Sequence, residues 1–332
     1  MSEYCKCCGQ KYNDARSLLA NSCSHHPEGR DESAFHEDDQ CDDKNDDQGL
    51  GEAHEEFRRK VIGGLDVEKD CEVIAHRAAC AVCEALAKFK EGFVASGDER
   101  ERELLDKAKE GGAKEQYEYA DYISHVCDRS DWDVVDEKLC CAAMFWYASA
   151  AKDGHFRAMR ELGEAFHGCG VDMYGEGYFS EDESALIPID EEISFACHLV
   201  AERLGDACSA RRVFMHYLAD RYDVAIEIAG RFSALPYKEC EPNEKWDDYQ
   251  DRLYIKMLQS EVDLVLGKGE PIDPARWKPW ERPYAFAVCH ENGWRIEKDI
   301  DKALEYYRKA FENGCVKAAD AIARLEKVKS TC

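Results

Sequence analysis

Four glycines each follow the same spacing of small and bulky residues, and this repetition constrains the fold more than any other feature of the chain. They are Gly112, Gly154, Gly205 and Gly314. An alanine stands four positions before each of them, and a bulky apolar pair stands seven and eight positions before all except Gly205. Spacings of three, four and seven residues place these side chains on one face of a helix. The sequence therefore predicts a helix before each glycine.

The glycine itself indicates a turn that leads into a second helix. Glycine adopts the left-handed conformation at a helix C-terminus without a steric penalty from Cβ. A small residue four positions later, as at Ala158 and Ala318, lets the second helix approach the first. Since one hairpin cannot bury its apolar face alone, the hairpins are expected to stack. We predict an all-α array of helix–turn–helix units over residues 100–332, preceded by a helical part over 57–99.

Two segments carry this pattern far enough to resemble a known family. In the segment 284–325 the matching positions are Gly293, Asp299, Ala303, Tyr306, Tyr307, Ala310, Gly314 and Ala318. The segment 143–168 follows the same pattern. Both are similar to Sel-1-like repeats, which are relatives of the tetratricopeptide repeat, and the similarity covers roughly residues 100–328. The resemblance implies a right-handed α/α solenoid that serves mainly as a protein-binding scaffold, and it implies no catalytic residues.

Acidic residues outnumber basic ones, and this excess limits the kinds of molecule that the chain can bind. The 332 residues include 70 Asp and Glu against 44 Lys and Arg, a formal net charge of −26. We therefore expect no nucleic-acid binding by the main body, because nothing attracts phosphates, and we favour a protein partner that carries a basic patch. Residues 37–56 hold ten of these acids against one base, Lys44. Self-repulsion and the lack of apolar residues predict an extended, disordered linker there.

The first 36 residues are rich in cysteine and histidine and predict a small zinc module. Cys5 and Cys8 form a Cys-x-x-Cys pair, and Cys23 follows fifteen residues later. The spacing resembles a two-Cys two-His finger, and a segment this short needs a metal to fold. We predict structural zinc on these three thiolates, with His26 or His36 as the fourth ligand. The sequence leaves the choice between the two histidines open.

One further group of metal-ligating residues stands on a predicted helix. His76, Cys80 and Cys83 share a face at spacings of four and three. We interpret them as core residues rather than metal ligands, because free cysteine is commonly buried. No catalytic constellation and no phosphate-binding loop stands out elsewhere, so we predict no catalytic residue, no bound cofactor other than zinc and no small-molecule substrate.

The predicted stack implies a surface on which a partner can bind. We expect a long concave face lined by the first helix of each unit, over 113–126, 156–167 and 284–292. Trp277, Trp280 and Trp294 stand near prolines in the carboxy-terminal part. They form either a recognition patch or the packing of a long connection against the helices.

These observations together favour an interaction scaffold in a cytoplasm-like compartment. The longest apolar run, about 140–151, is too short to cross a membrane, and no secretory signal is visible. The cysteines are then expected to be reduced. The leading hypothesis is a non-enzymatic scaffold or adaptor. The alternatives are a secreted-type repeat enzyme acting on β-lactams, which export and a disulfide ladder would favour, and a zinc-finger regulator of nucleic acids.

Overall fold

A computed structural model describes residues 3–4, 11–12, 47–90, 99–127, 137–167, 187–235, 246–268 and 278–331. The contacts between residues divide the protein into two compact units, Met1–Gly51 and Glu52–Cys332. Apart from one short strand pair, the described elements are helices, which confirms the all-α prediction. The helices are α2 (Asp47–Val61), α3 (Cys71–Ala85), η2 (Ala87–Phe89), α4 (Glu99–Glu110), α5 (Ala113–Cys127), α6 (Glu137–Lys152), α7 (Phe156–Phe166), α9 (Glu191–Arg203), α10 (Ala207–Tyr217), α11 (Tyr222–Ser233), α12 (Trp246–Val265), α13 (Glu281–Asn292), α14 (Ile300–Glu312) and α15 (Lys317–Thr331).

The strand pair belongs to the amino-terminal unit. Strand β1 (Glu3–Tyr4) pairs with β2 (Lys11–Tyr12) in antiparallel register, with Glu3 opposite Tyr12. The pair therefore brackets the Cys-x-x-Cys segment in the sequence. The predicted zinc ligands lie outside the described residues: Cys5, Cys8, Cys23, His26 and His36.

The predicted linker 37–56 differs from the structure over its last part. Helix α2 begins at Asp47, so residues 47–56 are helical rather than extended. No proline interrupts residues 47–56, and the helix continues into residues that pack against other helices of the second unit. The ring of Phe57 lies 6.0 Å from that of Phe166 between centroids. Tertiary packing at the end of the helix offsets the charge repulsion that favoured an extended chain.

The glycine turns join helices as predicted at three of the four positions. Gly154, Gly205 and Gly314 have φ of 89°, 104° and 102°. In each turn, the N–H of the residue after the glycine donates to the carbonyl of the alanine that stands four positions before the glycine. The three distances are 2.9–3.0 Å. This is the six-to-one hydrogen bond of a Schellman motif, in which a left-handed glycine ends the helix.

Gly112 does not have this role. Its φ is not positive, so it does not adopt the left-handed conformation of the other three glycines. Its N–H instead donates to Glu115 Oε2 at 3.0 Å, which satisfies a free donor at the start of α5. The predicted helix C-cap at Gly112 is therefore wrong, although a helix does lie on each side of it.

The residue after the glycine begins the second helix of two hairpins. His155 caps α7 by accepting the Ala158 N–H at 3.3 Å, and Asp206 caps α10 by accepting the Ser209 N–H at 2.7 Å. Turn and cap thus stand next to each other, so the chain reverses within a few residues. Ala158 and Ser209 are both fully buried, as expected of the small residues at a close helix contact.

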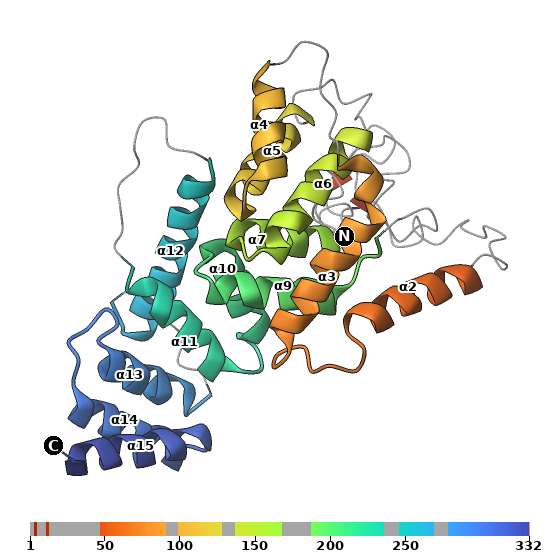
Figure 1. The fold of residues 1–332 in the computed structure, drawn as a ribbon. Helices are drawn as coiled ribbons and strands as arrows, with labels where there is room; N and C mark the ends of the chain where they lie inside the picture. The colour runs from red at the N-terminus through yellow and green to blue at the C-terminus, as the bar shows by residue number, and fades with distance from the viewer. Residues whose placement is uncertain are drawn as a thin grey trace, which may run out of the picture. The chain divides into compact units, whose positions relative to one another are not determined.

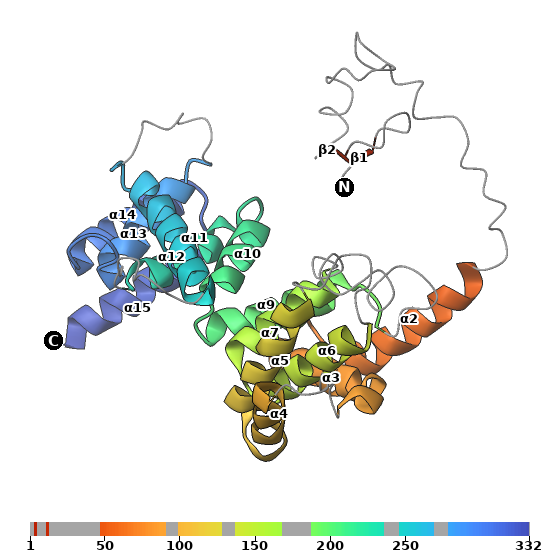
Figure 2. The ribbon, with the colours of Figure 1, turned by 90° about the horizontal axis from the view of Figure 1, so that it is seen from above.

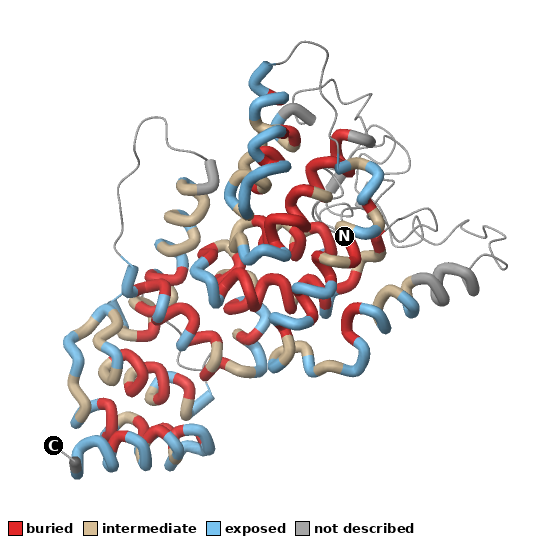
Figure 3. The backbone as a smooth tube through the Cα atoms, viewed as in Figure 1, coloured by how far each residue is buried: buried red, intermediate tan, exposed pale blue. Residues whose placement is uncertain are grey.

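Successive helices pack against one another through most of the second unit. Contacts join α4 to α5, α5 to α6, α6 to α7, α7 to α9, α9 to α10, α10 to α11 and α11 to α12. Beyond these, α13 packs on α11 and α14, and α14 packs on α15. Figures 1 and 2 show α9 and α10 lying between the helices α3–α7 and the helices α11–α15. The buried residues form one cluster that follows the inner faces of the helices (Figure 3).

Candidate functional site

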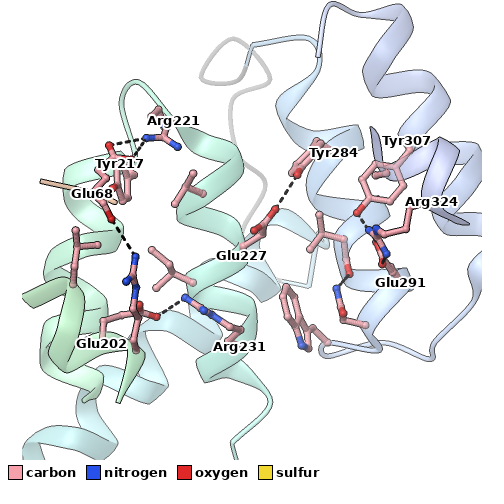
Figure 4. A pocket seen from close by; sticks show the side chains of 18 residues that line it. Glu68, Glu202, Tyr217, Arg221, Glu227, Arg231, Tyr284, Glu291, Tyr307 and Arg324 are labelled. Carbon is pink, nitrogen blue, oxygen red and sulfur yellow. Dashed lines mark hydrogen bonds and ion pairs between the residues drawn. The ribbon is translucent and has the colours of Figure 1, made fainter. Parts of the chain in front are cut away.

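A groove of about 500 Å³ lies among the helices of the carboxy-terminal half (Figure 4). Side chains from α9, α10, α11, α13, α14 and α15 line it, together with Glu68 from the segment before α3. Its glutamates are Glu68, Glu202, Glu227 and Glu291. Its arginines are Arg203, Arg221, Arg231 and Arg324. The formal charges of this lining cancel, in contrast to the acidic chain as a whole.

Helical periodicity brings these side chains to one side. Glu227 and Arg231 stand one turn apart on α11, and Tyr284 and Glu291 stand two turns apart on α13. Residues separated by three, four or seven positions share a helix face. Because α11 and α13 are in contact, their two polar faces border the same groove.

Carboxylates pair with the arginines along the groove. Arg221 donates to Glu68 at 2.7 Å, and Arg324 donates to Glu291 Oε2 at 3.1 Å. These hydrogen bonds to carboxylates raise the pKa of both guanidinium groups. The arginine side chains remain about half exposed, so the pairs are open to exchange with groups of a ligand.

Glu202 is buried and Glu291 is partly buried, and the pKa values of the two carboxyl groups move in opposite directions. Burial raises the pKa of Glu202, although Arg231 pairs with it and opposes the shift. Burial also acts to raise the pKa of Glu291, but the hydrogen bonds from Arg324 and Tyr307 outweigh it and the pKa is lowered. Glu291 therefore favours the ionised carboxylate, whereas ionisation of Glu202 is supported mainly by Arg231.

Two tyrosines join the carboxylates to the apolar floor of the groove. The Tyr284 hydroxyl donates to Glu227 Oε1 at 2.9 Å, and the Tyr307 hydroxyl donates to Glu291 Oε2 at 2.7 Å. The two rings pack edge to face, with centroids 5.6 Å apart and an interplanar angle of 72°. Burial raises the pKa of both tyrosines, and the adjacent carboxylates raise it further. Both hydroxyls therefore remain protonated hydrogen-bond donors.

The residue types of the lining are those of a binding surface as much as of a polar site. The described residues around the groove include no serine, threonine, cysteine, lysine or histidine, so its ionisable side chains are glutamates, arginines and tyrosines. Arginine, tyrosine and tryptophan are present instead, and these are enriched in protein–protein interfaces. The groove therefore offers aromatic surface, hydrogen-bond donors and hydrogen-bond acceptors side by side.

A second polar group has the composition of a catalytic triad but is closed to solvent. His198 Nδ1 lies 3.1 Å from Ser209 Oγ, and His198 Nε2 lies 3.7 Å from Glu164 Oε1. Ser209 is fully buried and His198 is only 1% exposed. Burial, followed by nearby arginines, lowers the pKa of His198 to about 3. His198 and Ser209 act as a buried polar link between α9 and α10, with Glu164 of α7 beside them, rather than as a site that a substrate can enter.

The helical group at His76, Cys80 and Cys83 is not a three-ligand metal site. Cys80 Sγ lies 3.6 Å from His76 Nε2, but Cys83 Sγ turns toward the Phe145 carbonyl at 3.9 Å. Burial raises the pKa of Cys83 to about 11, which keeps its thiol protonated. No cluster of three or more metal-ligating side chains occurs among the residues that the structure describes.

The predicted concave face corresponds to the groove only in part. The groove is lined by residues from the range 284–292. Among the described residues that line it, none comes from 113–126 or 156–167. Trp294 lines the groove and Trp280 packs edge-on against Tyr284, with ring centroids 6.2 Å apart. Trp277 lies outside the described residues. The tryptophans thus serve in part as packing residues.

The groove-lining side chains of α9 and α11 were not predicted from the sequence. Glu202, Glu227 and Arg231 belong to charged helix faces that normally point to solvent, so their pattern gave no signal by itself. An i, i+4 Glu–Arg pair on a helix with apolar residues on both flanks was the available clue.

Comparisons of the chain with protein-family models, with curated proteins and with solved structures give no match. Among the described helices, none has the length and apolar character that crossing a bilayer requires.

Proposed function

We propose that this chain is a non-enzymatic interaction scaffold of the Sel-1-like kind, with a right-handed α/α solenoid as its body. The support is the recurrence of one local design. At Gly154, Gly205 and Gly314, two packed helices meet at a Schellman turn, and small residues are buried at their contact. Helices that mainly touch their neighbours in the sequence are typical of repeat proteins.

The groove is the proposed docking site for a protein partner, and its lining carries this proposal. An extended peptide offers carbonyls to Arg203 and Arg221, N–H groups to Glu227, and side chains to the surface around Trp294. Each arginine already has a carboxylate partner, so a ligand exchanges one ion pair or hydrogen bond for another. Specificity then depends on geometry more than on net charge.

The charge of the whole chain acts at longer range. A net charge of −26 attracts a partner that carries a basic patch and speeds its encounter. The balanced groove then provides the short-range contacts. Binding is therefore expected to slow as salt rises, because salt screens the steering step.

The amino-terminal module is proposed to bind structural zinc through Cys5, Cys8, Cys23 and either His26 or His36. The donor set fits zinc, which prefers a tetrahedral mixture of thiolate and imidazole. The antiparallel pairing of β1 with β2 supports it, since the strands bracket the Cys-x-x-Cys pair. Zinc would hold the two ends of the module together, and the ligand thiols would bind it as thiolates.

A reducing, cytoplasm-like compartment is part of the same proposal. Cys71, Cys197, Cys289 and Cys315 are buried thiols without a disulfide. Burial raises the pKa of each, which makes these thiols poor nucleophiles. They serve as small packing residues.

The experiment compares two charge-reversal variants of the full chain in a pull-down that captures its partner. Arg203→Glu changes the groove at an exposed arginine, while Arg308→Glu changes another exposed arginine, which lies on α14 outside the groove. Arg203→Glu is expected to lose the partner and Arg308→Glu to retain it, with equal melting temperatures. Equal retention by both variants would move the docking site away from the groove.

A further inference from the structure

The groove has as many glutamates as arginines, yet one of its glutamates has no cationic partner. Three of them each have an arginine within the lining, in the pairs Glu68–Arg221, Glu202–Arg231 and Glu291–Arg324. The fourth arginine of the lining is matched from outside it, since Arg203 Nη1 lies 3.5 Å from Glu72 Oε1. Among the described residues, Glu227 is therefore the groove carboxylate that no arginine or lysine pairs with.

The charges next to Glu227 on α11 are matched as well. Asp223, one turn before it, pairs with Lys317 of α15. Arg231, one turn after it, pairs with a glutamate of α9. In the described part of the chain, Glu227 accepts only from a neutral donor, the Tyr284 hydroxyl, which lies 2.9 Å from Oε1 (Figure 4). Because Glu227 is exposed and lines the groove, a ligand can reach its carboxylate.

An aromatic ring borders the same part of the groove. The indole of Trp294 fills the space beside Gly230, which stands three residues after Glu227 and so shares its face of α11. Val224 and Val288 add apolar side chains to the lining. A carboxylate next to an indole suits a cation on an apolar stem, because the stem packs on the ring while the cation reaches the carboxylate.

We propose that the groove takes up a lysine side chain of the protein partner, with its ammonium on Glu227 and its carbon stem along Trp294. This inference rests on the docking function proposed above and states which donor of the partner reaches Glu227. Lysine fits better than arginine because Tyr284 already donates to one oxygen of the carboxylate. A guanidinium pairs best with both oxygens at once, whereas an ammonium is a compact point charge.

The test follows the indole N–H signal of Trp294 by NMR in the ¹⁵N-labelled full chain. The chain has six tryptophans, and Trp294→Phe identifies the signal by its loss. The probe is a peptide with acetylated and amidated ends, in which one lysine stands between two alanines on each side. It is expected to shift the Trp294 signal in a saturable manner. The same peptide with norleucine keeps an apolar stem without the charge and is expected to leave the signal unmoved, and the arginine peptide is expected to bind several-fold more weakly.

Two matched variants locate the charge that the lysine recognises. Glu227→Gln keeps the size of the side chain and an acceptor for Tyr284, and it is expected to weaken binding of the lysine peptide several-fold. Glu312→Gln, at an exposed glutamate of α14 outside the groove, is expected to leave binding unchanged. A Trp294 signal that ignores the lysine peptide, or that responds equally to the norleucine peptide, overturns the proposal. Unchanged affinity in Glu227→Gln, or an arginine peptide that binds as tightly, overturns it as well.

The pull-down of the partner separates this proposal from the docking function. If Arg203→Glu loses the partner while the lysine peptide leaves Trp294 unmoved, the docking function stands and the lysine site is rejected. If Arg203→Glu retains the partner while the lysine peptide binds at Trp294 and Glu227, the lysine site stands and the docking function is rejected.

Discussion

The indole of Trp294 occupies the space that a side chain on Gly230 would need. A Cβ built on Gly230, in the last turn of α11, would lie 1.9 Å from Trp294 Cε3. Glycine is therefore required at this position for close approach rather than for an unusual backbone angle. The contact joins α11 to the segment after α13, the two elements on either side of the groove.

Gly230→Ala is expected to lower the free energy of unfolding by about 1–3 kcal/mol, because the added methyl must displace a bulky ring from a packed site. Urea unfolding measures the loss, and the tryptophan emission of the folded variant should shift to the red as Trp294 becomes exposed. The matched control is Gly112→Ala, where the new Cβ meets only Glu115 Oε2 at 3.8 Å. A control change within about 0.5 kcal/mol is expected. Equal stability of the two variants would contradict the packing described here.

Gly154→Val tests the turn between α6 and α7. A Cβ at Gly154 meets nothing within 4 Å, so any cost comes from the φ of 89° alone. A β-branched residue held there should lose about 1–3 kcal/mol of stability. Lys152→Gln, two residues earlier and exposed, is the control. Equal melting temperatures of the two variants would show that the turn tolerates a side chain.

His198 should make the fold sensitive to acid. Its pKa is lowered from 6.5 to about 3 by burial, so at pH 5 the unfolded chain binds a proton there and the folded chain does not. The unfolded state then holds more protons, and stability rises with pH up to about 6.5 and falls below it. The expected loss between pH 8 and pH 5 is about 2 kcal/mol from this group.

Urea unfolding of the wild type and of His198→Gln at both pH values isolates this contribution. The variant should lack that part of the pH dependence, whatever its absolute stability. His125→Gln, which alters a histidine with a 54% exposed side chain, should keep it. An identical pH dependence of His198→Gln and wild type would mean that His198 is protonated in the folded protein.

The proposed zinc ligands can be tested by substitutions within one short segment. Metal analysis of the purified full chain is expected to find zinc, and the double variant Cys5→Ser with Cys8→Ser is expected to lose it. Cys7→Ser is the matched control, since Cys7 lies between the two and is not part of the Cys-x-x-Cys pair. Zinc that survives the double variant, or that disappears with Cys7→Ser, would reject the proposed ligand set.

Much of the helical fold could be predicted from the sequence, because its main determinants are local. The positive φ of Gly154, Gly205 and Gly314 follows from a glycine at a fixed distance after an apolar helix face. Gly112 has the same spacing, yet Glu115 captures its N–H and the turn differs. One side chain three residues away thus changed the role of the glycine.

The groove could not be predicted, since it depends on contacts between residues far apart in the chain. Glu68 meets Arg221 from a segment about 150 positions earlier, and no local pattern encodes that pairing. The tertiary position of α2 was missed for the same reason. Phe57 and Phe166 are brought together only by the fold. Charged residues on a helix give the same pattern whether they face solvent or a groove.

Hydrogen–deuterium exchange tests the central claim, that the groove binds the protein partner, most directly. The full chain is measured alone and with the partner that it captures at low salt. We predict that amides of 199–203, 221–231 and 284–294 exchange more slowly in the complex, and that Arg203→Glu abolishes this protection while Arg308→Glu preserves it. Protection confined to helices α3 to α7 or to the first 36 residues, with the groove peptides unchanged, would contradict the account.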